Sequence, residues 1–218
     1  MWTLPNILTM IRLIAAPMVA VMFLYFTRPY ADWAALILFV GAALTDWLDG
    51  FLARAWKQES KLGAMLDPIA DKAMVVIALV VLASVFGLDA MILLPATLIV
   101  FREVFVSGLR EFLGDVSGTL QVTKMAKWKT TAQMMAIALL FAVGIFEHYL
   151  VIITAGMDRQ IAADILASGL ADPAHLRLVY NGMHATWFSG IALLWVAAAL
   201  TVITGADYFR KALPHLRD

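Results

Sequence analysis

Four aspartates are grouped in one short stretch of an otherwise apolar sequence. They are Asp46, Asp49, Asp67 and Asp71. Carboxylates are hard oxygen ligands, and a cluster that contains neither His nor Cys favours Mg²⁺ or Mn²⁺. Two such ions, held about 3.5–4 Å apart, commonly clamp a phosphate group between them. The stretch therefore predicts a site for a divalent cation, with two ions expected, that acts on a phosphate.

The first pair of aspartates is expected on one face of a helix. The residues at i, i+3, i+4, i+7 and i+8 of this face are Asp46, Asp49, Gly50, Ala53 and Arg54. Those intervals return to the same side of an α-helix. The small residues would let a ligand come close, and a guanidinium is well suited to a phosphate.

The second pair follows a glycine at the same helical interval. Gly63, Asp67 and Asp71 are spaced i, i+4 and i+8, which is one stripe if their helix begins early. A helix that begins near Asp67 would instead place Pro68 in its first turn and Gly63 in the turn before it. In either case the two pairs can face each other, and four close carboxylates need a counter-charge. Simple pairing with nearby Arg and Lys at a membrane interface is the alternative to metal binding.

The composition places these residues in a membrane protein. Of 218 residues, 63% are hydrophobic and 15% are charged, whereas a typical soluble domain has about 25% charged residues. Apolar stretches long enough to span ~30 Å of hydrocarbon recur along the chain. We expect an all-α polytopic membrane protein that forms one domain, residues 1–218, with six transmembrane helices. Their expected ranges are 7–26, 33–54, 67–88, 90–113, 129–155 and 184–209.

Other features of the composition exclude several classes of site. The chain has no Cys, which excludes disulfides and thiolate catalysis. Its 16 basic and 16 acidic residues give no net charge, and no nucleic-acid partner is expected. The four histidines lie away from the aspartates in the sequence, so a histidine base is not expected either. The insert at 156–182 has Ile161, Ile165 and Leu166 at helical spacing, which indicates a short interfacial helix.

The aspartate stretch resembles the signature of the CDP-alcohol phosphatidyltransferase family. The match runs D-x2-D-G-x2-A-R-x8-G-x3-D-x3-D from Asp46 to Asp71, and the opening PNILTMIR also fits the family. The resemblance implies a six-helix membrane enzyme, usually a homodimer, that displaces CMP from a CDP-linked lipid. It implies that the four aspartates hold the metals and that Asp71 is also the general base. The positions that would contact the CDP-lipid are Asn6, Gly50, Ala53, Arg54, Ser60 and Gly63.

The fourth and fifth apolar stretches offer a basic lining for the acceptor alcohol. The first of them places Arg102, Glu103, Ser107 and Arg110 on one side of a helix. Such a lining suits an acceptor that bears an anionic phosphate. Anchoring of the lysines at anionic lipid headgroups is the alternative. The residues expected to bind the acceptor phosphate are Arg102, Arg110, Lys127, Lys129 and Thr130.

These two runs are similar to those of family members that use glycerol 3-phosphate, except that Ala126 stands in place of a glycine. The resemblance implies transfer of a phosphatidyl group from CDP-diacylglycerol to sn-glycerol 3-phosphate, in anionic phospholipid biosynthesis. The products would be phosphatidylglycerol phosphate and CMP. Family members that make cardiolipin or phosphatidylinositol phosphate use the same donor and remain alternatives. A divalent-cation transporter is a more remote one, since it would distribute carboxylates over several depths of the membrane.

Positive charge is concentrated at one set of helix ends. Of the sixteen Lys and Arg, only Arg28, Arg159 and Arg177 lie at the opposite ends. The positive-inside rule then places both termini and the aspartates on the cytoplasmic side of the membrane, which the resemblance implies is a bacterial inner membrane. It places the 156–182 insert on the outer side.

This topology can be tested by cysteine labelling, because the chain has no native Cys. We predict that a cysteine at Ala163, in the insert, reacts with a membrane-impermeant thiol reagent in intact cells. A cysteine at Ser117, in the 114–128 loop, should react only after the membrane is permeabilised. Labelling of Ser117 but not Ala163 in intact cells would mean that the orientation is inverted.

Overall fold

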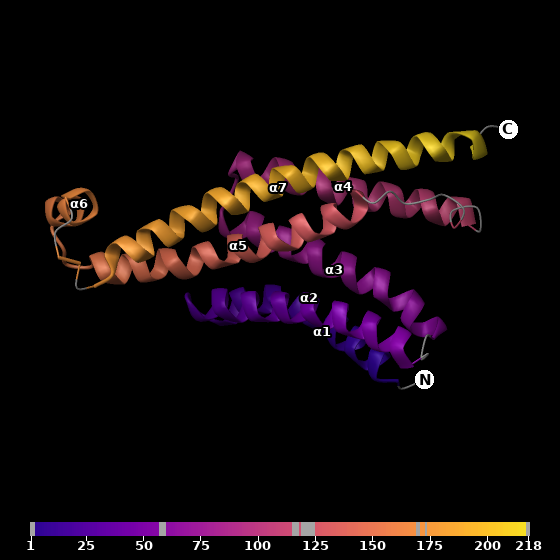
Figure 1. Cartoon of the computed structure of the whole chain (residues 1–218), viewed down its shortest axis with the longest axis horizontal. Coiled ribbons are helices and arrows are strands. Elements are labelled where there is room, and N and C mark those ends of the chain that lie inside the picture. The colour runs from indigo at the N-terminus through magenta and orange to yellow at the C-terminus, as the bar shows by residue number, and fades with distance from the viewer. Residues whose placement is uncertain are drawn as a thin grey trace. The chain divides into compact units, whose positions relative to one another are not determined.

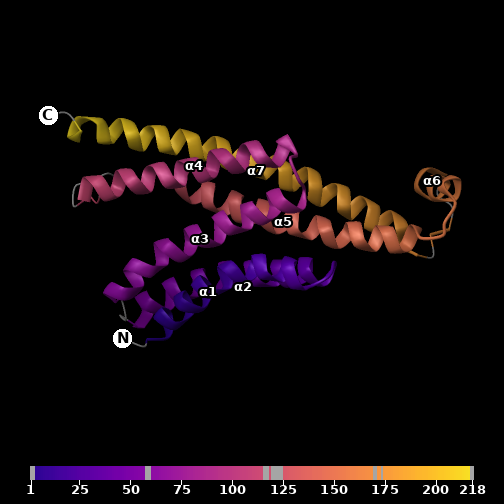
Figure 2. The same ribbon diagram turned by 180° about the vertical axis from the view of Figure 1, so that it is seen from behind.

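The protein is helical throughout the part of the chain that its structure, a computed structural model, describes. The structure describes residues 3–56, 60–114, 118, 125–168, 171–172 and 174–216. Within these ranges, the side chains of residues 47–56, 125–127 and 168 are not described. Seven α-helices and a final 3₁₀ turn follow one another in these ranges (Figures 1 and 2). They are α1 (Leu4–Tyr25), α2 (Tyr30–Trp56), α3 (Lys61–Val85), α4 (Ala90–Leu113), α5 (Met125–Thr154), α6 (Arg159–Ser168), α7 (Leu176–Ala212) and the turn Leu213–His215.

Five of the long helical segments are apolar enough to cross a membrane. These are α1, α3, α4, the Trp128–Thr154 part of α5, and Leu176–His215, which joins α7 to the final turn. The prediction of an all-α, multi-pass membrane protein is thus confirmed in its coarse form. Helix α2 has 27 residues but is not among the five. A sixth span remains a prediction.

Helix α3 begins earlier than the predicted start near Asp67. It starts at Lys61 and contains Pro68 in its interior rather than in its first turn. Ser60 precedes the helix, and its Oγ accepts a hydrogen bond of 3.0 Å from the backbone N–H of Gly63. A serine in this position satisfies one of the unpaired N–H groups of the first turn, which explains the early start. Gly63, Asp67 and Asp71 therefore all lie on one helix.

Helix α7 also begins earlier than predicted, at Leu176 instead of His184. The two carboxylate oxygens of Asp172 accept hydrogen bonds from the backbone N–H groups of Leu176 (2.7 Å) and Arg177 (2.9 Å). These bonds, the one from Arg177 above all, hold the pKa of the Asp172 carboxyl below its usual value. The last seven residues of the predicted 156–182 insert, 176–182, are consequently the first part of α7. The short helix expected around Ile161 is confirmed as α6.

The chain divides into two compact units, to both of which α3, α5 and α7 contribute. Unit 1 comprises Met1–Ala78 and Ala138–Gly190, and unit 2 comprises Leu79–Ile137 and Ile191–Asp218. In unit 1, α1 and α2 lie side by side (Figures 1 and 2). The ring of Phe141 on α5 packs against Phe23 of α1 and Phe39 of α2, with centroid distances of 6.0 and 6.1 Å. This aromatic cluster joins the three helices within the unit.

A bidentate ion pair lies near the start of α2 in unit 1. Arg28 donates from Nε and Nη2 to the two carboxylate oxygens of Asp32, each at 2.8 Å, and Asp32 is 1% exposed. The hydrogen bonds to Asp32 raise the pKa of the Arg28 guanidinium. A Cβ atom on Gly144 of α5 would overlap both side chains of the pair. Glycine at this position therefore lets α5 approach the ion pair closely.

In unit 2, α4 packs along α7. The indole Nε1 of Trp195 donates to the backbone carbonyl oxygen of Met91 at 3.0 Å, and the rings of Phe105 and Phe209 are 5.5 Å apart. A Cβ on Gly205 would lie 2.8 Å from Cγ of Arg102, closer than such contacts normally occur. The glycine thus gives the long Arg102 side chain room to lie against α7.

Candidate active site

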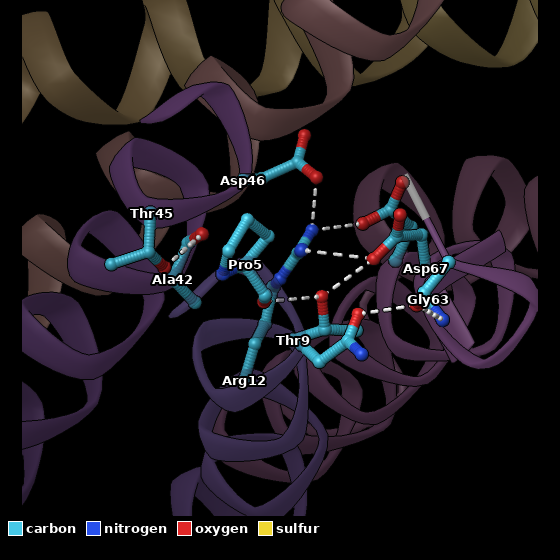
Figure 3. A network of polar contacts seen from close by, with 11 residues as sticks. Pro5, Thr9, Arg12, Ala42, Thr45, Asp46, Gly63 and Asp67 are labelled. Atoms are coloured by element: carbon cyan, nitrogen blue, oxygen red, sulfur yellow. Dashed lines mark hydrogen bonds and ion pairs between the residues drawn. The ribbon is translucent and has the colours of Figure 1, made fainter. Parts of the chain in front are cut away.

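Arg12 of α1 lies among three of the four predicted metal-binding aspartates. Its Nη1 atom donates to Oδ1 of Asp46, on α2, and to Oδ1 of Asp71, on α3, the latter at 2.6 Å. Its Nη2 atom is 3.8 Å from Oδ1 of Asp67. Figure 3 shows these contacts converging on the guanidinium. The structure therefore brings Asp46, Asp67 and Asp71 together, as the two helical stripes predict, and the group at their centre is an arginine.

The four side chains differ sharply in their exposure. The Arg12 side chain is 2% exposed, whereas those of Asp46, Asp67 and Asp71 are 42%, 47% and 45% exposed. A buried guanidinium is tolerated only where carboxylates or other acceptors satisfy it. The half-exposed carboxylates have surface left for a ligand that arrives from outside. The cluster thus has a buried, positively charged floor, the Arg12 guanidinium, and a half-exposed, negatively charged rim, the carboxylates of Asp46, Asp67 and Asp71.

One face of α1 supplies the floor of the cluster. Pro5, Asn6, Thr9 and Arg12 are all buried and recur at helical spacing. Thr9 Oγ1 donates to Oδ1 of Asp67 at 2.6 Å, on the same carboxylate that Arg12 approaches (Figure 3). The hydroxyl and the guanidinium together fix the orientation of Asp67 with respect to α1.

Asn6, Ser60 and Gly63, which the family resemblance assigns to the CDP-lipid, lie together at the start of α3. Ser60 Oγ donates to Oδ1 of Asn6 at 2.8 Å and accepts from the backbone N–H of Gly63. Asn6 is 2% exposed. A Cβ on Gly63 would lie 2.7 Å from Oδ1 of Asn6, which is shorter than real contacts of this kind. The three residues thus join α1 to the first turn of α3, one helical turn before Asp67.

Five predicted site residues lie outside the described side chains. Asp49, Gly50, Ala53 and Arg54 belong to α2 and Lys127 belongs to α5, but the structure describes only their backbone. The metal site therefore stays a prediction. Among the side chains that are described, no three His, Asp or Glu residues are spaced to share one metal ion. The donor set itself, three carboxylates gathered around one cationic group, is chemically suited to a hard divalent cation.

Four of the five predicted acceptor residues lie in the described part of unit 2, where Glu103 contacts two of them. Its Oε1 accepts hydrogen bonds from Lys129 Nζ and, at 3.0 Å, from Arg102 Nη1. Arg102 Nη2 also lies 3.4 Å from the hydroxyl of Thr204 on α7. Lys129 is 8% exposed, so it lies in the protein interior. Anchoring to lipid headgroups does not describe this lysine in the structure.

Arg110 and Thr130 differ from this buried group. Both are exposed. The Arg110 guanidinium carbon is 5.2 Å from the ring centroid of Tyr208, which is a cation–π contact between α4 and α7. Of the predicted basic residues with described side chains, Arg110 is therefore the most accessible to a soluble phosphate.

Sequence reasoning did not identify Arg12 and Thr9 as parts of the aspartate cluster, or Tyr208 as a partner of Arg110. A signal for the first two was present, because Asn6, Thr9 and Arg12 are polar residues at i, i+3 and i+6 in an apolar stretch. Ionisable residues inside membrane helices usually face protein or a polar cavity. For Tyr208 the sequence offers no comparable signal, since a tyrosine near a helix end is common at membrane interfaces.

Comparison with known proteins gives a match along nearly the whole chain. The family model described as CDP-alcohol phosphatidyltransferase matches residues 2–203. A protein of Cereibacter sphaeroides is 62% identical over all of this chain and 98% of its own length. One of Escherichia coli is 39% identical over 100% and 98%, and one of Rickettsia bellii is 36% identical over 95% and 93%. Each of these three is called CDP-diacylglycerol–glycerol-3-phosphate 3-phosphatidyltransferase.

The contacts at the start of α3 give a prediction for Gly63→Ala. Replacement of a helical glycine by alanine ordinarily stabilises a helix by about 0.5–1 kcal/mol. At Gly63 the new methyl group would displace the buried Asn6 and break its hydrogen bond to Ser60. Loss of a partner by a buried polar group costs about 1–3 kcal/mol, which exceeds that gain. The matched control is Gly41→Ala on α2, where a Cβ would meet nothing within 4 Å.

Thermal unfolding in detergent, followed by tryptophan fluorescence, compares the two variants. We expect Gly41→Ala to have a Tm equal to or above that of the wild type and Gly63→Ala to have a lower one. If Gly63→Ala is as stable as Gly41→Ala, the close packing of α1 on the start of α3 is not a constraint on this residue.

Proposed function

We propose that this chain, which belongs to the CDP-alcohol phosphatidyltransferase family, transfers a phosphatidyl group from CDP-diacylglycerol to sn-glycerol 3-phosphate. The products would be phosphatidylglycerol phosphate and CMP. The observation that carries the proposal is the similarity to proteins named for this reaction, at 62% identity over the full chain in one case. The gathering of Asp46, Asp67 and Asp71 in unit 1 supports it, because three aspartates of the family signature meet at one place.

In the proposed reaction, a hydroxyl oxygen of glycerol 3-phosphate forms a bond to the phosphorus of the phosphatidyl group. The bond between that phosphorus and the bridging oxygen breaks, and CMP leaves with this oxygen. The hydroxyl proton passes to Asp71, which acts as the general base. Asp71 is half exposed, so a substrate hydroxyl can reach it.

The cofactor in this proposal is Mg²⁺ or Mn²⁺, with two ions held by Asp46, Asp49, Asp67 and Asp71. A divalent ion, when bound, neutralises charge on the pyrophosphate and on the departing CMP. The CDP-lipid would contact the small and polar residues around these aspartates. Those residues are Asn6, Gly50, Ala53, Arg54, Ser60 and Gly63.

The acceptor phosphate is assigned to the basic residues of unit 2, with Arg110 as its first contact. Arg110 is exposed, and Tyr208 orients its guanidinium. Arg102 and Lys129 both pair with the carboxylate of Glu103. In this proposal they add positive charge to the acceptor site, and Arg110 makes the first contact with the phosphate. Lys127 and Thr130 complete the proposed set.

The proposal extends to the cellular setting of the protein. The relatives are bacterial, and we assign the chain to the inner membrane, with α2 as a sixth span. The charge bias supports cytoplasmic termini and a site that faces the cytoplasm. We further propose a homodimer, in line with the family resemblance.

The direct test is a screen of acceptors. Membranes or purified protein are mixed with Mg²⁺, CDP-diacylglycerol and one candidate alcohol at a time, and CMP release is measured. We expect release with glycerol 3-phosphate, and release only with phosphatidylglycerol or with inositol phosphate would assign the chain to another branch of the family.

A first prediction concerns the general base. With glycerol 3-phosphate as acceptor, Asp71→Asn should lower kcat by at least about 10²-fold, the usual contribution of general base catalysis. Residual activity above a tenth of the wild type would remove Asp71 from that role.

A second prediction concerns the acceptor phosphate. A charge-assisted hydrogen bond contributes roughly 1.5–3 kcal/mol, which corresponds to about ten- to a hundredfold in affinity. Arg110→Ala should therefore raise the KM for glycerol 3-phosphate by this factor and leave the KM for CDP-diacylglycerol nearly unchanged. Arg110→Lys should recover only part of the loss, because a point charge does not replace a planar fork.

Both KM values are measured for each variant in mixed micelles, with Lys127→Ala as a further variant. Arg177→Ala serves as the control, since Arg177 lies at the opposite end of α7 from Tyr208. Equal increases in the two KM values would indicate that Arg110 shapes the fold rather than the acceptor site. An unchanged KM for glycerol 3-phosphate would exclude Arg110 from acceptor binding.

A further inference from the structure

We infer that Arg12 is a positioning residue whose guanidinium supplies the counter-charge of the aspartate cluster and competes with a divalent cation for its carboxylates. The inference rests on the proposed metal site. It adds to that proposal a residue outside the aspartate signature, on a different helix, and a direction for its effect on cation binding.

The contacts that carry this inference come from three helices. The Arg12 guanidinium contacts Oδ1 of Asp46 and Oδ1 of Asp71 and lies near Oδ1 of Asp67. Thr9, one turn earlier on α1, donates to that same oxygen of Asp67. Figure 3 shows Arg12 reaching in from α1, with Asp46 above its guanidinium and Asp67 to the right of it. One fixed positive charge thus holds together carboxylates that would otherwise repel one another.

The burial of Arg12 shows that this arrangement is built into the fold. At 2% exposure its guanidinium is almost entirely removed from solvent, so no water replaces the carboxylates as hydrogen-bond acceptors. A surface ion pair between flexible side chains contributes little to stability, but a buried charge that loses its partners is strongly destabilising. The aspartate cluster and Arg12 therefore depend on each other.

The same geometry makes Arg12 a competitor of the cation. A magnesium ion binds carboxylate oxygens at about 2.0–2.1 Å, and the proposed ion would draw on the Asp46 and Asp71 carboxylates to which the guanidinium already donates. Two positive groups on the same oxygens repel each other in a medium of low dielectric constant. Binding of the cation should therefore weaken the Arg12 contacts, and removal of Arg12 should make cation binding tighter.

The test uses the full-length protein in detergent and reads cation binding directly. Mn²⁺ binding is followed by electron paramagnetic resonance, and Tm is measured in EDTA and in saturating Mg²⁺. For Arg12→Met, prepared in Mg²⁺, we expect the Mn²⁺ midpoint to fall at least about tenfold, because a charge-assisted hydrogen bond to the shared oxygens is worth at least that factor. Its Tm should be lower than that of the wild type in EDTA, and Mg²⁺ should restore most of the difference.

Two further variants separate this role from a purely structural one. Arg12→Lys keeps the charge but not the fork, so its Mn²⁺ midpoint should fall by a smaller factor, and this variant also serves if Arg12→Met does not fold. Arg28→Met removes another arginine of unit 1 that pairs with a buried aspartate, Asp32. It should lower Tm equally in EDTA and in Mg²⁺ and leave the Mn²⁺ midpoint unchanged.

The outcomes distinguish the inference from the function on which it rests. If the wild type binds Mn²⁺ and releases CMP but the Arg12 variants bind Mn²⁺ with the same or weaker affinity, the role of Arg12 is overturned while the proposed function stands. If the wild type binds no Mn²⁺ at all, the metal site is wrong and the inference falls with it. A larger gain in Tm from Mg²⁺ in Arg12→Met than in the wild type, together with a lower Mn²⁺ midpoint, supports it.

Discussion

The contact of one buried guanidinium with three carboxylates is the interaction on which the rest of unit 1 depends. Asp46 comes from α2, whereas Asp67 and Asp71 come from α3, and in a low-dielectric setting these negative groups repel one another. Only a positive charge placed between the two helices makes their approach favourable. Arg12 supplies it from a third helix, so α1, α2 and α3 must meet at the level of the aspartates.

Glycines allow helices to approach one another closely at this cluster and at two other places in the structure. Inside a membrane, helices gain little from hydrophobic association, and close packing through small residues replaces it. Gly63 lets Asn6 of α1 reach the first turn of α3, and Gly144 lets α5 approach the Arg28–Asp32 pair. Gly205 does the same for Arg102 against α7 in unit 2. In each case the residue that requires the space is polar, so the glycines serve the placement of hydrogen bonds and charges as well as helix packing.

The sequence predicts which residues share one face of a helix, but it does not predict which side chains from different helices contact each other. The i, i+4, i+8 spacing of Gly63, Asp67 and Asp71 predicts one stripe if their helix begins early, and the structure has that early start. The start of α3 was missed, since it depends on a cap by Ser60 that competes with the breaking effect of Pro68. The contacts of Arg12 lie 34 and 59 residues away in the sequence. No local pattern determines which of several acidic groups such a side chain meets.

Arg12 and its carboxylate partners differ in exposure, and this difference separates a structural role for the guanidinium from a ligand-facing role for the carboxylates. The guanidinium is fixed in the interior, and it compensates one of the three negative charges that surround it. The carboxylates are nearly half exposed and keep an excess of negative charge toward the outside. Among the described side chains, this excess favours a ligand that brings positive charge, as the proposed divalent cation would. An anionic phosphate alone would be repelled by these carboxylates, since the single charge of Arg12 is smaller than the sum of theirs.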